Sequence, residues 1–511
     1  MDNALQYARA VSASSELMRS SSPIVDLQTP SAVDRYRFTF GAVSFIWALL
    51  IVTLEIVLSL VGPQYAIGTG AVLAFTAIVI QLRRVGATSS GPVLLFALTM
   101  SVFIWARPII ALHSSDFDLR MIEVLTGITV TEAGLNIYFA TVVASLVAFS
   151  ATVLAFQFSI PAARSLEPQT VDRAFAGSAR FTWRMLFVIG AIASLTQSVL
   201  YIRYFLSGAS YYDLYVTGTD TVGPPGLSFL ASLLFYGYLG LLVVSANDTS
   251  RREHRLRLAS TFVFVVVSLV GLTRGSRGEV FTELLVGLWM YSFTGGKSIL
   301  VRHWLIYGVG LLGLSQVVGA LRSGDAIFAG ETQIVKIGEW FVYSQGVSGE
   351  LVAPASTEFG VNPENVRFLL SPLLTPFRRV FDPSFGAQTA QTGQSSGLLA
   401  HELAFRVAPE AYLAGRGAGS SYLAECYCSL GIFGVILATA ALTWIVLHGP
   451  HLFSRSRAAL FIFAASLPYI LFVPRESLML PVIPVLKATV LLLICRRLGT
   501  LYVYYRRHSN V

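Results

Sequence analysis

Residues 421–447 read SYLAECYCSLGIFGVILATAALTWIVL and contain a single charged side chain, Glu425. A hydrocarbon core about 30 Å thick needs roughly 20 mostly apolar helical residues to cross it, so this stretch is long enough to span a bilayer. Similar apolar runs recur along the chain, which is 54% hydrophobic and 13% charged, with a mean hydropathy of +0.67. A soluble domain with so little charge could not cover its surface, and the pattern therefore predicts an integral membrane protein.

The apolar runs are too long and too continuous for the alternating strands of a membrane barrel. We therefore expect an all-α, polytopic fold with about twelve transmembrane helices. The expected spans are 40–61, 65–82, 92–112, 133–158, 183–206, 227–246, 259–272, 280–294, 305–321, 421–447, 458–473 and 478–495. The expected divisions are an N-terminal tail at 1–37, transmembrane helices within 38–321, a large loop at 322–420, further transmembrane helices within 421–495 and a C-terminal tail at 496–511.

Basic residues gather in alternate connections between the spans, as at Arg83 and Arg84 and again at Arg251 and Arg252. The intervening short loops are almost free of Lys and Arg, and residues 207–226 contain neither. Because short cytoplasmic loops carry the excess of basic residues, we expect both termini in the cytoplasm and the large loop in the periplasm. The net charge of +8 lies mainly on the cytoplasmic face, where anionic membrane lipid is a sufficient partner, so we expect no nucleic-acid binding.

The connection 322–420 is much longer than the others and is moderately apolar. It contains aromatic and aliphatic clusters at 340–343 and 368–370, and four prolines from Pro363 to Pro383. A loop of this length in a compact protein is usually functional. We expect short helices that lie on or dip into the membrane surface and cover the helix bundle. The alternative is a mobile decoration.

Several arginines fall on the expected outer face, where the positive-inside rule disfavours them. Arg107 lies inside the third span and Arg203 inside the fifth. Arginines in or beside the membrane are costly and mark candidate sites, and planar guanidinium groups bind multi-oxygen anions bidentately. A lipid pyrophosphate fits this pattern, whereas the alternative for each arginine is a structural pair with a neighbouring acid. The candidate binding residues at the outer ends of spans are Arg274, Arg277, Glu279, Arg322, Arg416 and Arg475.

A glycine-rich segment, GRGAGSS at 415–421, precedes the tenth span. Glycines allow backbone N–H groups to approach a ligand before a helix N-terminus, which favours anion binding near Ser421 and Tyr422. Glu425 follows one turn later, where a carboxylate is costly unless paired, and we expect Arg416 or Arg277 as its partner. Glu425 is thus a candidate base or sugar-orienting group, and the alternative is a purely structural role.

His401 is the only histidine in 322–420 and is a second candidate general base, because its ordinary pKa near 6.5 suits proton transfer. Lone histidines are more often structural. The three cysteines, Cys426, Cys428 and Cys495, have no metal-ligand spacing, and the chain contains no P-loop, GxGxxG or HExxH motif. We therefore expect no cofactor and no metal.

Two short motifs add to this pattern: SRGE at 276–279, and GxGxSxxAExYxxxG from Gly417 to Gly431. Together with the topology, they resemble bacterial Wzy-type O-antigen polysaccharide polymerases. The resemblance implies an inner-membrane glycosyltransferase of GT-C-like architecture, which transfers a growing glycan from undecaprenyl pyrophosphate to the next lipid-linked repeat unit in the periplasm. Arg277 and Glu279 match the first motif, and Ser421 and Glu425 the second. The resemblance also implies a role in lipopolysaccharide biosynthesis and a chain-length regulator as partner. The sequence contains no acidic cluster resembling the metal sites of many other sugar-transferring membrane enzymes, so a metal-independent reaction is the simpler interpretation.

Three other functions remain open from the sequence. An O-antigen ligase uses the same donor with a lipid A core acceptor. Nothing in the sequence shows which acceptor the protein uses. A secondary transporter or lipid flippase predicts ionisable residues near mid-bilayer and paired broken helices, but most charges here lie at the outer ends, with Glu55, Arg107 and Lys487 as exceptions. A non-catalytic scaffold would leave the outer arginines unexplained.

Overall fold

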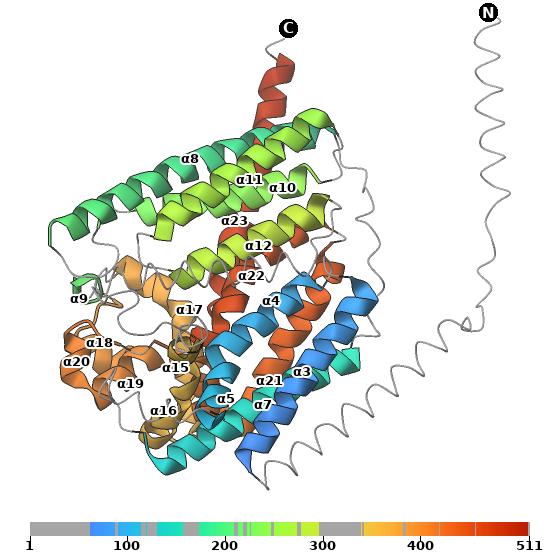
Figure 1. Ribbon diagram of the computed structural model, residues 1–511. Helices are drawn as coiled ribbons and strands as arrows, with labels where there is room; N and C mark the ends of the chain where they lie inside the picture. Colours follow the sequence, from blue (N-terminus) through green and yellow to red (C-terminus); the bar gives the residue numbers. More distant parts are fainter. Residues whose placement is uncertain are drawn as a thin grey trace, which may run out of the picture.

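A computed structural model describes residues 62–86, 90–113, 119, 130–156, 173–208, 213–217, 222–224, 226–246, 250–272, 277–295, 339, 342–381, 385–417, 419–454 and 456–508. Within these ranges the chain is helical, and the β-structure is limited to an isolated bridge between Phe385 and Ala387. The long helices lie side by side as a bundle, and a group of short helices covers one end of it (Figure 1).

Eight helical stretches in the described ranges are long and apolar enough to cross a membrane. They are Tyr65–Val85 in α3, Gly91–Leu112 in α4 to α5, Glu132–Phe156 in α7, Ala179–Leu206 in α8, Leu227–Val244 in α10, Arg251–Gly271 in α11, Tyr422–Phe453 in α21 and Arg457–Arg475 in α22 to η7. Each overlaps an expected span, so the described part of the chain has the expected all-α, polytopic form.

The remaining expected spans have two different outcomes. Those at 280–294 and 478–495 fall in α12 (Arg277–Gly295) and α23 (Val482–His508), which are helical but are not among the eight apolar stretches. Those at 40–61 and 305–321 lie outside the described residues.

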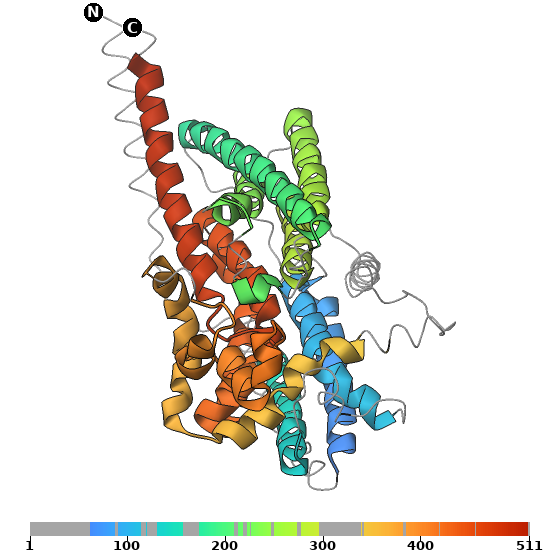
Figure 2. The same cartoon turned by 90° about the vertical axis from the view of Figure 1, so that its left-hand side faces the viewer.

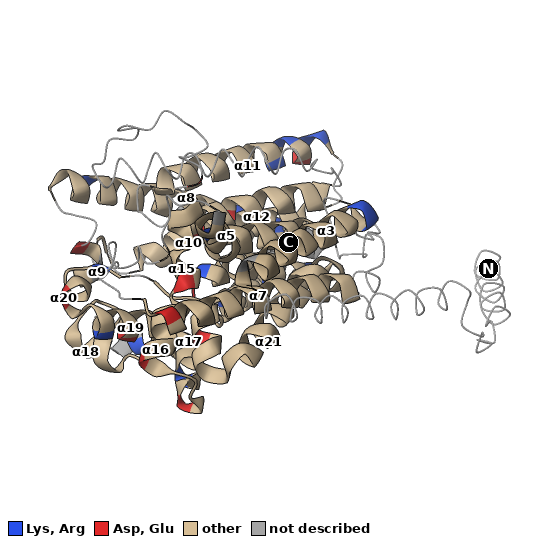
Figure 3. Cartoon of the chain, turned by 60° about the horizontal axis from the view of Figure 1, so that its bottom comes forward, with Lys and Arg blue, Asp and Glu red and all other residues tan. Residues whose placement is uncertain are grey.

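The two ends of the bundle differ in charge. Arg83 and Arg84 end α3 (Pro63–Val85), and Arg251 and Arg252 begin α11 (Arg251–Gly271). The blue ends of α3 and α11 lie on the same side in Figure 3. We call this side the basic end, where Glu253 of α11 also accepts a hydrogen bond of 3.1 Å from Arg180 of α8 (Arg173–Leu206).

The opposite end carries a cap, which we define as the described helices between residues 347 and 413. These are α15 (Val347–Glu350), α16 (Val352–Phe359), η6 (Pro363–Asn365), α17 (Val366–Phe381), α18 (Ala390–Ser395), α19 (Leu399–Val407) and α20 (Pro409–Leu413). Helix α16 packs against α7 (Glu132–Phe156) and α21 (Tyr422–Phe453), and α17 packs against α21. The described part of 322–420 is therefore folded onto the bundle, at what we call the capped end (Figure 1).

Helices α8 and α10 (Leu227–Val244) approach each other backbone to backbone at Gly190. A Cβ atom at this position would overlap the backbone of Leu233 and Leu234 in α10. Close approach at small residues lets van der Waals contacts replace the hydrophobic effect, which does not drive helices together inside a lipid bilayer. Gly190 therefore sets the distance between these two spans.

We expect Gly190→Ala to lower the thermal unfolding temperature of the purified protein in detergent, because overpacking costs about 1–3 kcal/mol. Gly68→Ala in α3 is the matched control, since a Cβ at Gly68 would meet no atom within 4 Å. The control should unfold at the wild-type temperature. Equal unfolding temperatures for both variants would contradict the close packing of α8 on α10.

Candidate active site

The turn after α22 (Arg457–Phe472) brings several elements of the capped end together. It begins with the 3-10 turn η7 (Val473–Arg475), whose second residue, Pro474, has a fixed φ and no N–H group. Helices α15, α21 and α22 and the π-helical turn η1 (Ser101–Trp105) all contact η7. We call residues 473–478 the junction segment, because the cap and the bundle meet there.

Glu425 lies in the first turns of α21 and is 1% exposed. Its Oε1 accepts a hydrogen bond from the Ser420 hydroxyl at 2.9 Å. Its Oε2 accepts one from the Ser477 hydroxyl at 2.9 Å and one from the Leu478 N–H at 3.1 Å. Hydroxyl and amide donors from the junction segment therefore hold this carboxylate.

The expected pairing of Glu425 with Arg416 or Arg277 stays a prediction, and the described partners of Glu425 are hydroxyl and amide groups. Arg416 is exposed, in the segment between α20 and α21, and the side chain of Arg277 is outside the described atoms. A buried carboxylate needs donors but not necessarily a cation, and nearby hydroxyl groups meet that need at a smaller desolvation cost than a second buried charge. Sequence spacing could not reveal this, because Ser477 and Leu478 lie far from Glu425 along the chain.

Arg475 is held by groups from the other side of the junction segment. Its Nη1 donates a hydrogen bond to the side-chain carbonyl oxygen of Gln345, which lies just before α15. Its guanidinium carbon lies 5.7 Å from the ring centroid of Phe103 in η1. The junction segment thus carries Ser477, which binds the candidate base Glu425, and Arg475, a candidate anion ligand. These two residues are separated by one position.

A fully buried ion pair joins the cap to the third span. Nε of Arg107, in α5 (Ala106–His113), lies 2.5 Å from Oε2 of Glu350 in α15, and both side chains are inaccessible to solvent. Nη1 of Arg107 also donates to the Tyr343 carbonyl at 2.9 Å, and its guanidinium lies 4.0 Å from the Tyr343 ring centroid. Removing one partner of such a pair leaves an uncompensated buried charge.

Neither Arg107 nor Glu350 is among the expected site residues. The sequence contains one usable signal, since an arginine inside a span calls for a carboxylate partner. It does not identify that partner, because Glu350 is one acid among several in the long loop. The π-helical turn directly before Arg107 is a second signal, because such turns are frequent at functional sites, but hydropathy does not reveal it.

Helix α21 is broken at Gly431, whose φ of 64° and ψ of −155° are not helical. The break separates a short half, Tyr422–Leu430, from the rest of the span. In a continuous helix, the Cys428 carbonyl would accept the N–H of the residue four positions later, which this break prevents. A carbonyl without a donor is costly beside lipid, so broken spans need partners from elsewhere in the protein.

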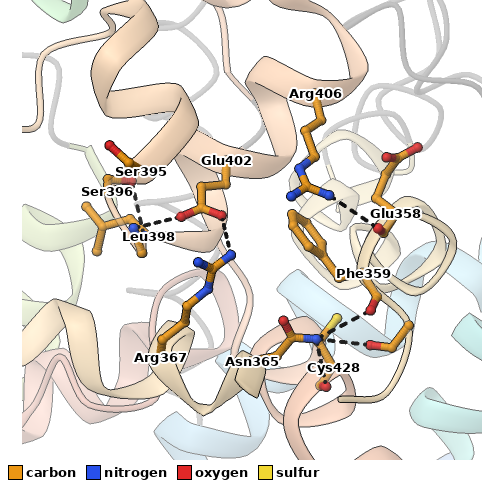
Figure 4. A network of polar contacts seen from close by, with 12 residues as sticks. Glu358, Phe359, Asn365, Arg367, Ser395, Ser396, Leu398, Glu402, Arg406 and Cys428 are labelled. Atoms are coloured by element: carbon orange, nitrogen blue, oxygen red, sulfur yellow. Dashed lines mark hydrogen bonds and ion pairs between the residues drawn. The ribbon is translucent and has the colours of Figure 1, made fainter. Parts of the chain in front are cut away.

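The cap provides those partners at the break. The Cys428 carbonyl accepts the N–H of Asn362 at 2.9 Å and the side-chain amide of Asn365 at 3.2 Å. The Ser429 hydroxyl donates to the Asn365 carbonyl at 3.1 Å. Figure 4 shows Asn365 directed at Cys428 and at the loop that follows α16. The half-helix that carries Glu425 is therefore bound by the cap at one end and by the junction segment at the other.

His401, the other candidate base, lies in α19 and hydrogen-bonds through Nδ1 to the Tyr412 hydroxyl at 2.7 Å. Its helix packs on α16, α18 and α20. The neighbouring Glu402 is buried and accepts Arg367 at 2.8 Å and the Gly397 N–H at 2.8 Å, which ties α17 to α19 (Figure 4). The described contacts therefore place His401 within the cap fold rather than at the junction segment.

The remaining expected site residues fall into three groups. Arg274 and Arg322 lie outside the described residues. Arg277 and Glu279 begin α12, and Glu279 accepts the Tyr469 hydroxyl of α22 at 3.0 Å, which brings this helix start close to the junction segment. Two residues are buried at the start of α21, namely Ser421, its N-cap residue, and Tyr422, whose hydroxyl lies 2.9 Å from that of Thr439.

Glu476 lies beside Arg475 in the junction segment and was not among the expected site residues. Burial, the largest cause, and the nearby Glu279 together raise the pKa of Glu476 to about 7, although the adjacent Arg475 lowers it. A carboxylate that titrates near neutral pH next to an arginine is a functional candidate on physical grounds. Its sequence signal is the Arg475–Glu476 pair in an outer loop, but the burial that shifts the pKa is a tertiary effect.

The model of the family described as O-antigen polysaccharide polymerase Wzy matches residues 38–506, nearly the whole chain. The chain belongs to this family. No curated protein and no solved structure gives a significant match. The resemblance noted from the motifs is confirmed, and the protein is a multi-pass membrane polymerase of the glycosyltransferase type that acts on lipid-linked O-antigen repeat units.

We expect Asn365→Ala to lower the unfolding temperature of this polymerase more than Asn362→Ala does. Asn365→Ala removes a buried side-chain donor to the carbonyls of Cys428, Phe359 and Gly360, and each lost hydrogen bond costs about 0.5–1.5 kcal/mol. Asn362→Ala is the matched control, because it keeps the backbone N–H to Cys428 and removes only an exposed bond from the Glu364 N–H. Thermal unfolding in detergent measures the difference. Equal losses would show that the side-chain bond at the break contributes nothing.

Proposed function

We propose that this polymerase transfers the growing glycan from undecaprenyl pyrophosphate to the next undecaprenyl-pyrophosphate-linked repeat unit, at the periplasmic face of the inner membrane. The basic end, with Arg83, Arg84, Arg251 and Arg252, supports a cytoplasmic location for that end. The capped end then faces the periplasm and both termini the cytoplasm. The product is O-antigen or a related surface polysaccharide.

The observation that carries this proposal is Glu425, a buried carboxylate on a broken span, held by Ser420, Ser477 and the Leu478 N–H at the capped end. A base must be fixed within hydrogen-bonding reach of the proton that it takes. The half-helix Tyr422–Leu430 meets this need, because the cap and the junction segment both bind it. Broken spans at membrane depth commonly line substrate sites.

In the proposed reaction, a hydroxyl oxygen of the acceptor repeat attacks the anomeric carbon of the donor glycan. The hydroxyl proton passes to the Glu425 carboxylate, and the bond between the anomeric carbon and the pyrophosphate oxygen breaks. Undecaprenyl pyrophosphate leaves with the bonding electron pair. Negative charge therefore grows on the pyrophosphate, and fixed positive charge near it stabilises the transition state.

The proposed ligands for the pyrophosphate are arginines of the capped end. Arg475 supports this role best, because Gln345 and Phe103 hold its guanidinium, and because it lies two residues before Ser477, which donates to Glu425. We include further residues in the proposed binding site because the sequence places them at the outer ends of spans. They are Arg274, Arg277, Glu279, Arg322, Arg416, Ser421 and Tyr422. These guanidinium groups supply positive charge for the leaving pyrophosphate, and the proposed reaction is metal-independent. Its proposed GT-C-like type follows from the family resemblance. A chain-length regulator is the proposed protein partner, by family resemblance.

Two other residues compete with Glu425 for the role of base. His401 has a suitable ring nitrogen but bonds to Tyr412 within the cap. Glu476 has a pKa of about 7 and adjoins Arg475, so it is the stronger competitor. If Glu476 were the base, activity would rise as the pH passes through about 7, because only the ionised carboxylate accepts a proton.

A deletion strain tests the overall function. We expect its surface polysaccharide profile to lose the long chains while a single repeat unit remains attached to the lipid A core. This pattern follows because ligation continues when polymerisation stops. Complete loss of attached sugar would instead indicate a ligase or a flippase and would overturn the proposal.

Isosteric variants assayed with purified lipid-linked repeat units separate the candidate bases. We expect Glu425→Gln to lower turnover by about a hundred- to ten-thousand-fold, the usual contribution of a positioned base, while donor binding persists. His401→Gln and Glu476→Gln serve as the comparison and should retain turnover within about tenfold of wild type. Full turnover by Glu425→Gln would remove Glu425 from the mechanism, and the pH profile of Glu476→Gln would then show whether Glu476 takes its place.

A further inference from the structure

Helix α17 (Val366–Phe381) reads VRFLLSPLLTPFRRVF. Its inner face packs against the protein, including α21. Phe368 is buried, with its ring 5.0 Å from that of Phe359 between centroids. Two arginines of α17 also bind the cap, since Arg367 binds Glu402 and Arg378 donates to the Ser396 carbonyl at 2.7 Å. The position of α17 on the cap is therefore fixed.

The outer face of α17 is apolar and exposed. Leu370, Leu374 and Phe377 are 49%, 48% and 61% exposed, and their spacing of four and three residues puts them on one side of the helix. We call these three residues the α17 stripe. Three large apolar side chains in helical register on an outer surface indicate a contact with something apolar.

The surroundings of α17 indicate what that contact is. Figure 2 shows α17, in gold, along the outer edge of the molecule. The helix starts beside α21, because Asn365, directly before it, accepts the Ser429 hydroxyl at 3.1 Å. The next outward residues of α21, Leu430 and Phe433, are exposed on a candidate membrane span and so face lipid. The α17 stripe therefore begins next to a lipid-facing surface.

Prolines limit how deep α17 can lie. Pro372 and Pro376 have no N–H group, so the carbonyls of Phe368 and Pro372 cannot receive the usual bond from four residues later. Hydrocarbon cannot supply a replacement donor, whereas water and lipid headgroups can. The interfacial layer of the membrane suits such a helix better than the hydrocarbon core does.

We propose that α17 lies in the outer interfacial layer of the bilayer and anchors the cap there, with the α17 stripe in contact with the acyl chains of phospholipids. Amphipathic helices of this kind bury their apolar face about 5–10 Å into the headgroup–acyl boundary. The partner is the bilayer itself, and the inference stands independently of which residue is the catalytic base. Because Asn365 joins α17 to the break in α21, this anchor also fixes the height of the Glu425 half-helix relative to the lipid.

Site-directed fluorescence in lipid nanodiscs tests this proposal. The native cysteines are buried, so cysteines introduced as Leu370→Cys, Leu374→Cys and Phe377→Cys can be labelled with a small environment-sensitive fluorophore. We expect blue-shifted emission at all three sites. A phospholipid with a nitroxide near the carbonyl end of its chain should quench them severalfold more than a water-soluble nitroxide, and more than a lipid with the nitroxide at the chain end.

Matched positions control for labelling and for depth. Glu364→Cys, an exposed site two residues before α17, should be quenched mainly by the aqueous nitroxide. Phe433→Cys in α21 is the lipid-facing reference, being 68% exposed on a candidate span. Aqueous quenching along the α17 stripe equal to that at Glu364→Cys would overturn the proposal. Protection from both quenchers would also overturn it, because it would mean that protein, such as a second copy of the chain, covers the stripe.

Discussion

A lipid bilayer offers no hydrogen bonds, and this constraint governs the architecture of the capped end. Each break in a spanning helix leaves backbone groups that only the protein can satisfy. At Gly431 the orphan carbonyl of Cys428 is satisfied by Asn362 and Asn365, which belong to the cap. The cap is therefore part of the spanning structure and not an appendage to it, because α21 could not keep its broken form without it.

The same constraint explains why charge at the capped end is buried in organised sets. Arg107 and Glu350 neutralise each other between the third span and the cap, and Glu425 takes its donors from Ser420 and the junction segment. These contacts fix the relative positions of α5, α15, α21 and η7. Catalytic groups in general need such fixed positions, since a preorganised site pays no reorganisation cost during the reaction.

Hydropathy predicted the spans well because each span is decided locally, by some 20 residues that meet lipid. It also located Glu425 and Arg475 as charges out of place at the ends of spans. It could not identify Ser477, Glu350 or Asn365, since each acts through a contact with a residue far away in sequence and is an ordinary loop residue by composition. The described donors to Glu425, from Ser420, Ser477 and the Leu478 N–H, could not be identified from the sequence for the same reason. The electrostatic argument correctly required partners, and among the described contacts these are hydroxyl and amide groups.

The broken helix also links two positions in evolutionary terms. A substitution at Gly431 that restored a continuous helix would give the Cys428 carbonyl its normal helical donor. The amide of Asn365 would then be left with the carbonyls of Phe359 and Gly360 as its described acceptors. Conversely, without Asn365 the Cys428 carbonyl of a broken helix would keep only the Asn362 N–H among its described donors. Glycine at position 431 and a side-chain donor at position 365 are thus expected to vary together among members of the family.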